Sequence, residues 1–122
     1  MSQEILVVED NPQNMELVEF LLEESGYQVR KAFDADELRR ELGVGLPSLV
    51  LMDIQLPGVD GLQLVGEIRQ REDAANLPII ALTAHAMRGD RERFLAAGCD
   101  GYISKPIDIA TFASEVGAYL KT

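Results

Sequence analysis

Five polar residues follow short apolar runs of the sequence, and their types suit metal binding and phosphoryl transfer. Glu9 and Asp10 follow one run, Asp53 and Thr83 follow two others, and Lys105 follows a fourth. Carboxylate oxygens select hard cations, so Mg²⁺ is the expected occupant. No histidine or cysteine belongs to this set, which argues against zinc. A hydroxyl and an ammonium add the hydrogen bonding and positive charge that phosphoryl transfer needs.

Asp53 is the best candidate for a nucleophile among these carboxylates. Glu9 and Asp10 are adjacent in sequence, as a metal-holding pair should be. Asp53 stands alone, opposite Thr83 and Lys105, and a carboxylate can attack phosphorus to give an aspartyl phosphate. Three carboxylates at close range repel one another, so at least one should resist ionisation unless a cation lies among them.

The apolar runs that carry these residues have the length and composition of buried strands. Residues 5–8, 49–52 and 79–82 are continuous apolar runs, which is typical of strands covered on both faces of a parallel sheet. Residues 28–32 and 101–104 are more polar and are predicted to form the edge strands. Polar residues at the carboxyl ends of such strands share one edge of the sheet, where ligands bind.

Helical spacing of apolar residues separates the predicted strands. Asn11-Pro12 predicts a helix start, residues 35–42 and 65–68 carry short helical patterns, and residues 109–120 carry a final one with Asp108 as its expected N-cap. Five strand–helix units in alternation predict one α/β domain over residues 1–122, a doubly wound parallel sheet with five helices.

Composition narrows the classes of partner. The chain has 122 residues, a formal net charge of -10 and one cysteine. The negative charge disfavours binding to nucleic acid or to an anionic membrane surface. The single cysteine, the lack of a basic signal-peptide start and the lack of a long apolar run favour a cytoplasmic protein whose partners are proteins and cations.

Five motifs in order give the chain its resemblance to the receiver domains of two-component response regulators. They are Val8-Glu9-Asp10-Asn11, Met52-Asp53-Ile54-Gln55-Leu56-Pro57, Asp60-Gly61, Leu82-Thr83-Ala84 and Ser104-Lys105-Pro106. The stretch from Thr83 to Asp90 is most similar to stand-alone cell-cycle receivers and to the receivers of hybrid kinases. The resemblance implies strand order 2-1-3-4-5, Mg²⁺ binding and phosphotransfer from a histidine.

The resemblance also implies a role for each matched position. These are Asp53 as phosphoacceptor, Asp10 as direct metal ligand, Glu9 as a metal ligand through water, Gln55 as a metal ligand through its backbone carbonyl, Thr83 as switch hydroxyl, Tyr102 as switch aromatic and Lys105 as phosphate-binding lysine. His85, two residues after Thr83, is expected near the path of the hydrolytic water, where its exchange would change the dephosphorylation rate.

Partners follow from the same resemblance. The donor is expected to be a histidine kinase or a histidine phosphotransfer protein that docks on the first helix, and the output is expected to be contact with a downstream protein by a monomer. Apolar residues fill roughly 220° of that helix, with Met15 and Phe20 at the two edges of the arc. At least one of these two is therefore expected to be exposed and to anchor the donor.

Four alternatives remain open at this point. A haloacid-dehalogenase-type phosphatase would need a second Asp two residues after the nucleophile, where this chain has Gln55. A flavodoxin-like electron carrier would not place Glu9 and Asp10 against the phosphate of FMN, because the carboxylates would repel it. A binding-only pseudo-receiver would lack part of the pocket. A receiver cut from a hybrid histidine kinase would carry the same motifs, although the opening Met1 argues mildly against it.

Overall fold

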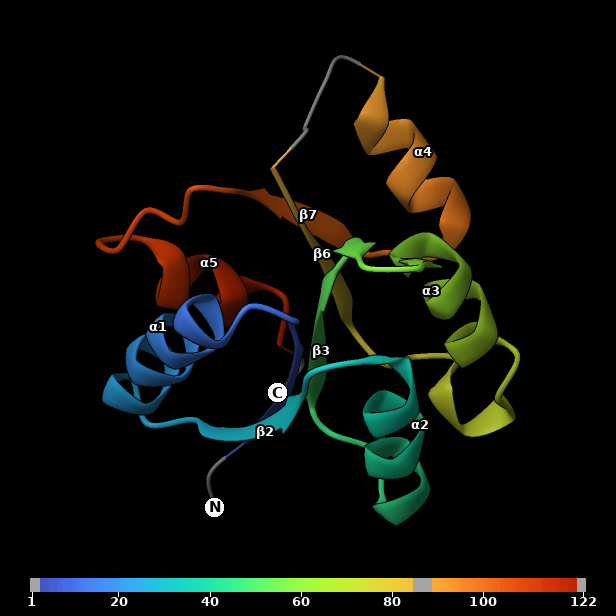
Figure 1. The fold of residues 1–122 in the computed structure, drawn as a ribbon, viewed down its shortest axis with the longest axis horizontal. Helices are drawn as coiled ribbons and strands as arrows, with labels where there is room; N and C mark the ends of the chain where they lie inside the picture. Colours follow the sequence, from blue (N-terminus) through green and yellow to red (C-terminus); the bar gives the residue numbers. More distant parts are fainter. Residues whose placement is uncertain (1–2, 85–88, 121–122) are drawn as a thin grey trace.

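A five-stranded parallel sheet organises the chain (Figure 1), and the computed structural model describes residues 3–84 and 89–120 of it. The strands lie in the order β2-β1-β3-β6-β7, while β4 and β5 form a separate antiparallel hairpin. Because of that hairpin, β6 and β7 are the fourth and fifth strands of the main sheet, and the predicted order 2-1-3-4-5 is confirmed. The strands are β1 (Glu4–Val8), β2 (Gln28–Ala32), β3 (Leu49–Asp53), β4 (Gln55–Leu56), β5 (Val59–Asp60), β6 (Ile79–Thr83) and β7 (Gly101–Ser104).

The described residues form five α-helices, as the sequence predicts; the first four connect strands, and the fifth follows β7. Helices α1 and α5 cover one face of the sheet, and α2, α3 and α4 cover the other (Figure 1). The helices are α1 (Pro12–Glu24), α2 (Ala35–Val44), α3 (Gly61–Arg69), α4 (Asp90–Ala97) and α5 (Phe112–Ala118), with a short 3-10 helix at Glu72–Ala74. In the described part of the chain, no helix is long and apolar enough to cross a membrane.

The continuous apolar runs are explained by two cores, one on each face of the sheet. Along β1, Ile5 and Val7 pack toward α1 and α5, while Leu6 and Val8 pack toward α2, α3 and α4. Strand side chains alternate between faces, so a strand covered on both sides needs an apolar residue at every position. All five residues of β3 and of β6 are buried, which fixes the polar groups at their carboxyl ends in a rigid frame.

Helix α1 begins at the predicted position and buries more of its surface than a helix packed on one side. The Asn11 side chain accepts hydrogen bonds from the backbone N–H groups of Gln13 (2.8 Å) and Asn14 (3.1 Å), so it is the N-cap. Phe20 is 57% exposed, as expected for one edge of the arc, but Met15 is only 2% exposed. Met15 belongs to the core that includes Phe112 of α5. A surface docking role does not fit Met15, because α1 packs against both the sheet and α5.

Helix α5 begins later than the sequence pattern predicts. The prediction of Asp108 as its N-cap is wrong, because the first helical residue is Phe112 and Thr111 precedes it. The Asp108 side chain instead accepts a hydrogen bond from the Ala110 N–H (3.0 Å), and its carbonyl accepts one from Phe112 N–H (2.9 Å). Asp108 therefore closes a turn ahead of the helix and leaves Ile109 exposed.

The β4–β5 hairpin holds the segment after Asp53 against α3. Asp60 caps α3 by accepting a hydrogen bond from the Leu62 N–H (2.9 Å), and the Gly61 N–H donates to the Ile54 carbonyl (3.2 Å). A Cβ atom on Gly61 would overlap the Ile54 Cα and lie 2.9 Å from the Asp53 carbonyl oxygen. Glycine at position 61 is what allows the backbones to approach this closely.

We therefore predict that Gly61→Ala lowers the free energy of unfolding by about 1–3 kcal/mol, the usual cost of overpacking a fixed site. Gly66→Ala is the matched control, because a Cβ atom at Gly66 meets nothing within 4 Å and the residue is inside the same helix. Alanine should favour that helix over glycine. Urea denaturation of both variants measures the difference, and equal stabilities would contradict the close approach at Gly61.

Candidate metal and phosphoryl site

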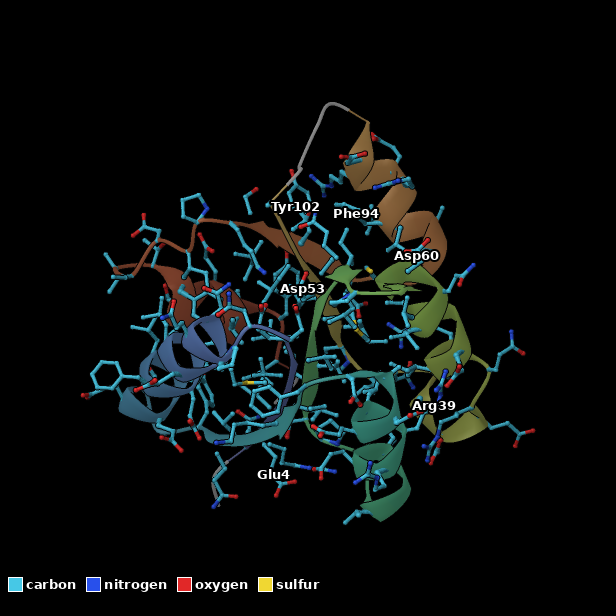
Figure 2. The ribbon with its side chains drawn as sticks, viewed as in Figure 1. Glu4, Arg39, Asp53, Asp60, Phe94 and Tyr102 are labelled. Atoms are coloured by element: carbon cyan, nitrogen blue, oxygen red, sulfur yellow. The ribbon has the colours of Figure 1, made fainter. Side chains whose placement is uncertain are left out.

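The sheet brings the five predicted polar residues to one edge, from four different strands. Glu9 and Asp10 follow β1, Asp53 is the last residue of β3, Thr83 is the last residue of β6, and Lys105 follows β7. Figure 2 shows Asp53 at the end of β3, beside the neighbouring strands. Glu9 is 1% exposed and Asp53 2% exposed, whereas Asp10 faces solvent. The pocket thus has a buried acidic floor and an open acidic rim.

Lys105 joins two of the buried side chains. Its ammonium nitrogen Nζ lies 2.9 Å from Glu9 Oε2 and 3.0 Å from Asp53 Oδ2. The Lys105 backbone N–H donates to the Thr83 carbonyl (2.7 Å), which ties the lysine to the end of β6. The sequence predicts that Lys105 lies near the acidic groups. It does not predict that Lys105 pairs at once with Glu9, 96 positions away, and with Asp53, 52 positions away.

The environment changes the proton affinities of Glu9 and Lys105. Burial raises the pKa of the Glu9 carboxyl above its usual range, and the nearby Asp53 carboxylate adds to this while Lys105 opposes it. Burial disfavours the charged form of Lys105, but hydrogen bonds to Glu9 and Asp53 outweigh that effect and raise the pKa of Lys105. The lysine is therefore held in its charged form between Glu9 and Asp53.

Glu9, Asp10 and Asp53 form a donor set that fits a divalent cation. Each offers one carboxylate oxygen, and these oxygens lie within 4.8 Å of one another. All donors are oxygens, which suits Mg²⁺, and the open side at Asp10 leaves room for water and phosphate oxygens as further ligands. Asp53 would supply a ligand to the cation and remain next to the lysine.

Backbone and side-chain amide groups orient the carboxylates through hydrogen bonds that the sequence does not predict. The Asn11 N–H (3.3 Å) and the Asn14 side-chain amide (3.4 Å) both donate to Glu9 Oε1. The Gln55 N–H donates to Asp53 Oδ1 (2.9 Å), which leaves Asp53 Oδ2 to Lys105. Asn11 and Gln55 lie in the sequence motifs, whereas Asn14 carries no sequence signal, since its contact depends on one turn of α1.

Tyr102 lies on β7 next to α4 and packs on Phe94. The two rings meet edge to face, with centroids 5.5 Å apart, and Figure 2 shows both side chains between β7 and α4. Phe94 is fully buried, while Tyr102 is partly exposed. Thr83, on the neighbouring strand β6, is fully buried. His85, for which we predict an effect on dephosphorylation, lies outside the described residues.

Comparison with known proteins gives a family for this arrangement. Residues 5–116 match the response regulator receiver domain family. The chain is 43% identical over 98% of its length to the polar-differentiation response regulator DivK of Brucella ovis, and covers 98% of that protein. DivK of Brucella anthropi is 42% identical with the same coverage.

Solved structures agree with this family. The receiver domain of the sensor histidine kinase PA1611 from Pseudomonas aeruginosa is 39% identical, with a TM-score of 0.86 and 98% of each chain covered; in that structure a magnesium ion is coordinated in the active-site cleft. The chemotaxis protein CheY4 of Vibrio cholerae is 22% identical with a TM-score of 0.92, over 98% of this chain and all of that one, and shows the shared fold.

These matches set aside the phosphatase and electron-carrier alternatives, because the family match spans the whole set of motifs and the polar edge of the sheet. Relatives and solved structures point the same way, with 43% identity to a response regulator over 98% of the chain. The chain belongs to the response regulator receiver domain family, and it is a two-component signalling module and not an enzyme.

Proposed function

We propose that this chain is one receiver domain, residues 1–122, that accepts a phosphoryl group on Asp53 from a histidine kinase or a histidine phosphotransfer protein. An Asp53 carboxylate oxygen would attack the phosphorus of a phosphohistidine. The P–N bond then breaks, the imidazole leaves with its electron pair, and an acyl phosphate remains on Asp53. The observation that carries this proposal is the position of the Asp53 carboxylate, bonded to the Lys105 ammonium and the Gln55 N–H beside two more carboxylates.

Mg²⁺ would be held by the carboxylates of Asp10 and Asp53 and the backbone carbonyl of Gln55, with Glu9 acting through water. When bound, the cation supplies positive charge that offsets the charge of the transferred phosphoryl group. Lys105 already lies 3.0 Å from Asp53, so it can contact the phosphoryl oxygens without a large movement. The protein's own contribution is thus to orient Asp53 and to neutralise charge beside it.

The output would be a change of protein-binding surface. A phosphoryl group adds roughly -1.5 to -2 charges and three acceptor oxygens, which would draw in Thr83 and Lys105 and turn Tyr102 inward. Tyr102 lines a groove of about 670 Å³ formed by residues of α4, β7 and α5, with Arg91 and Glu115 among the other lining residues. A downstream protein that binds this groove would therefore detect the phosphoryl group. The relatives named as polar-differentiation response regulators support an output of this kind, in which the receiver regulates another protein.

Incubation with acetyl phosphate tests the proposed chemistry without a partner protein. In the presence of Mg²⁺, the intact mass should rise by one phosphoryl group. In excess EDTA, labelling should fall by about tenfold or more, because the acidic cluster then lacks its cation. Full labelling in EDTA would contradict the role of the metal, and no labelling with Mg²⁺ would contradict the role of the chain as a phosphoacceptor.

Phe20 is our proposed anchor for the donor. It lies on α1, whose first turn adjoins Glu9 and Asp10, and exposed aromatic side chains frequently carry binding energy. Phe20→Ala is expected to slow phosphotransfer from a histidine protein by about tenfold, which corresponds to about 1.4 kcal/mol. Labelling by acetyl phosphate should not change.

Val44→Ala is the matched control, because Val44 is 84% exposed on α2, on the opposite face of the sheet from α1. It should leave phosphotransfer and labelling unchanged. A large fall in melting temperature for Phe20→Ala would show that the ring stabilises the fold, and equal phosphotransfer rates for Phe20→Ala and the unaltered protein would remove Phe20 from the donor interface.

A further inference from the structure

Gln55 joins two parts of the pocket that lie on different strands. Its backbone N–H donates to Asp53 Oδ1 (2.9 Å), and its side-chain oxygen Oε1 accepts a hydrogen bond from the Ala84 N–H (3.1 Å). Ala84 directly follows Thr83 at the end of β6. One residue therefore contacts both the proposed phosphoacceptor and the first residue beyond the proposed switch hydroxyl.

The Gln55 end of this bridge is rigid. Gln55 pairs with Asp60 in the β4–β5 hairpin, and the next residue, Leu56, is buried. The hairpin is fixed to α3 by the Asp60 cap and by the close approach of Gly61 to Ile54. Ala84, in contrast, lies where the chain leaves the sheet and is exposed. A change in the bridge would therefore move Ala84 and not Gln55.

A phosphoryl group on Asp53 would compete with the Gln55 side chain for the Ala84 N–H. It brings three strong acceptor oxygens to a carboxylate that Gln55 already contacts. Lys105 Nζ lies 3.0 Å from Asp53 Oδ2, and Ala84 is two residues beyond Leu82, the residue on β6 that pairs with Asp53. The Ala84 N–H is occupied by the Gln55 side chain, so it can serve a phosphoryl oxygen only after that hydrogen bond breaks.

We propose that the Gln55 side chain is a positioning residue that holds the Ala84 N–H in the unphosphorylated arrangement and releases it to the phosphoryl group. This inference rests on the proposed function, because it needs phosphorylation at Asp53. The bridge would act against the phosphorylated state, and its strength would set part of the balance between the two arrangements. The bridge is solvent-exposed and neutral, so its effect on that balance is modest.

Beryllofluoride with Mg²⁺, a mimic of the phosphoryl group on a carboxylate, tests the bridge. Gln55→Met keeps the length of the side chain and the backbone carbonyl but removes the acceptor oxygen. We expect beryllofluoride to bind the variant about 2- to 10-fold more tightly than the unaltered chain, the range for one neutral hydrogen bond. Because the bridge stabilises the unphosphorylated arrangement, its loss should lower the melting temperature of the free variant slightly, and the Ala84 amide should exchange with solvent faster.

Gln63→Met is the control, since Gln63 is an exposed glutamine on α3; its beryllofluoride affinity should equal that of the unaltered chain. Equal or weaker beryllofluoride binding by Gln55→Met would overturn the inference, and so would an unchanged exchange rate at Ala84. If the unaltered chain itself fails to bind beryllofluoride with Mg²⁺, the proposed function fails first, which is a separate result from failure of the bridge.

Discussion

Asp53→Asn should abolish phosphoryl labelling, with a loss of about 100-fold or more in rate, because a carboxamide is not a nucleophile toward phosphorus. The other carboxylates cannot replace it in the same geometry. Glu9 is bonded to Lys105 and to Asn11 and Asn14, and Asp10 lies at the exposed rim. Labelling with acetyl phosphate and Mg²⁺, followed by intact-mass measurement, gives the rate.

The Asp53→Asn variant should remain folded. Asparagine has the shape of aspartate and keeps one oxygen that can accept from Lys105. Removal of one negative charge from a crowded acidic cluster offsets the loss of the acceptor for the Gln55 N–H. The control is the melting temperature in EDTA, which should be equal to or above that of the unaltered chain if Asp53→Asn is folded. Unchanged labelling in a folded Asp53→Asn variant would show that another residue is the acceptor.

Lys105→Ala should lower the free energy of unfolding in EDTA by about 3 kcal/mol, because removal of one partner leaves buried charges uncompensated. The lysine is the cation bonded to both Glu9 and Asp53, and all three side chains are largely buried. Mg²⁺ should restore much of the lost stability by neutralising the same carboxylates. The measurement is urea denaturation of the variant with EDTA and with Mg²⁺.

Two control variants separate the parts of this effect. Lys31→Ala removes an exposed lysine that pairs with Glu19, so it should cost about 1 kcal/mol or less. Asp10→Ala removes a direct ligand charge, so its Mg²⁺ affinity should fall by about tenfold or more, whereas Lys105→Ala should bind Mg²⁺ but fail to couple phosphorylation to the change of surface. Equal losses of Mg²⁺ affinity in Lys105→Ala and Asp10→Ala would contradict these roles.

The sheet was predictable from sequence because its three central strands, β1, β3 and β6, each contain a continuous run of four apolar residues. These strands are covered on both faces, so residues that point to either face, such as Val8 and Met52, are apolar. The more polar runs at 28–32 and 101–104 are the edge strands β2 and β7. The same arrangement made the shared polar edge predictable, since parallel strands end together. The resemblance supplied the strand order, which these patterns alone do not determine.

The two shortest strands, and the features that depend on contacts between distant segments, were not predictable from the sequence. Strands β4 and β5 have two residues each, too few for a periodic pattern. Met15 lies at the edge of its helical arc, yet it is buried because α5 covers a second side of α1. The helical spacing from Ile109 onward continues through a turn that Asp108 closes by hydrogen bonding. Each of these depends on contacts between segments far apart in sequence.

Chemical trapping of the phosphorylated residue tests the central claim most directly. Borohydride reduces an acyl phosphate on aspartate to homoserine, and peptide mapping by mass spectrometry then identifies the position. After incubation with acetyl phosphate and Mg²⁺, we predict homoserine at position 53, and much less of it in EDTA. Reduction at Asp10 instead, or a phosphoryl group found on the single histidine, His85, would contradict the assignment of Asp53 as the phosphoacceptor.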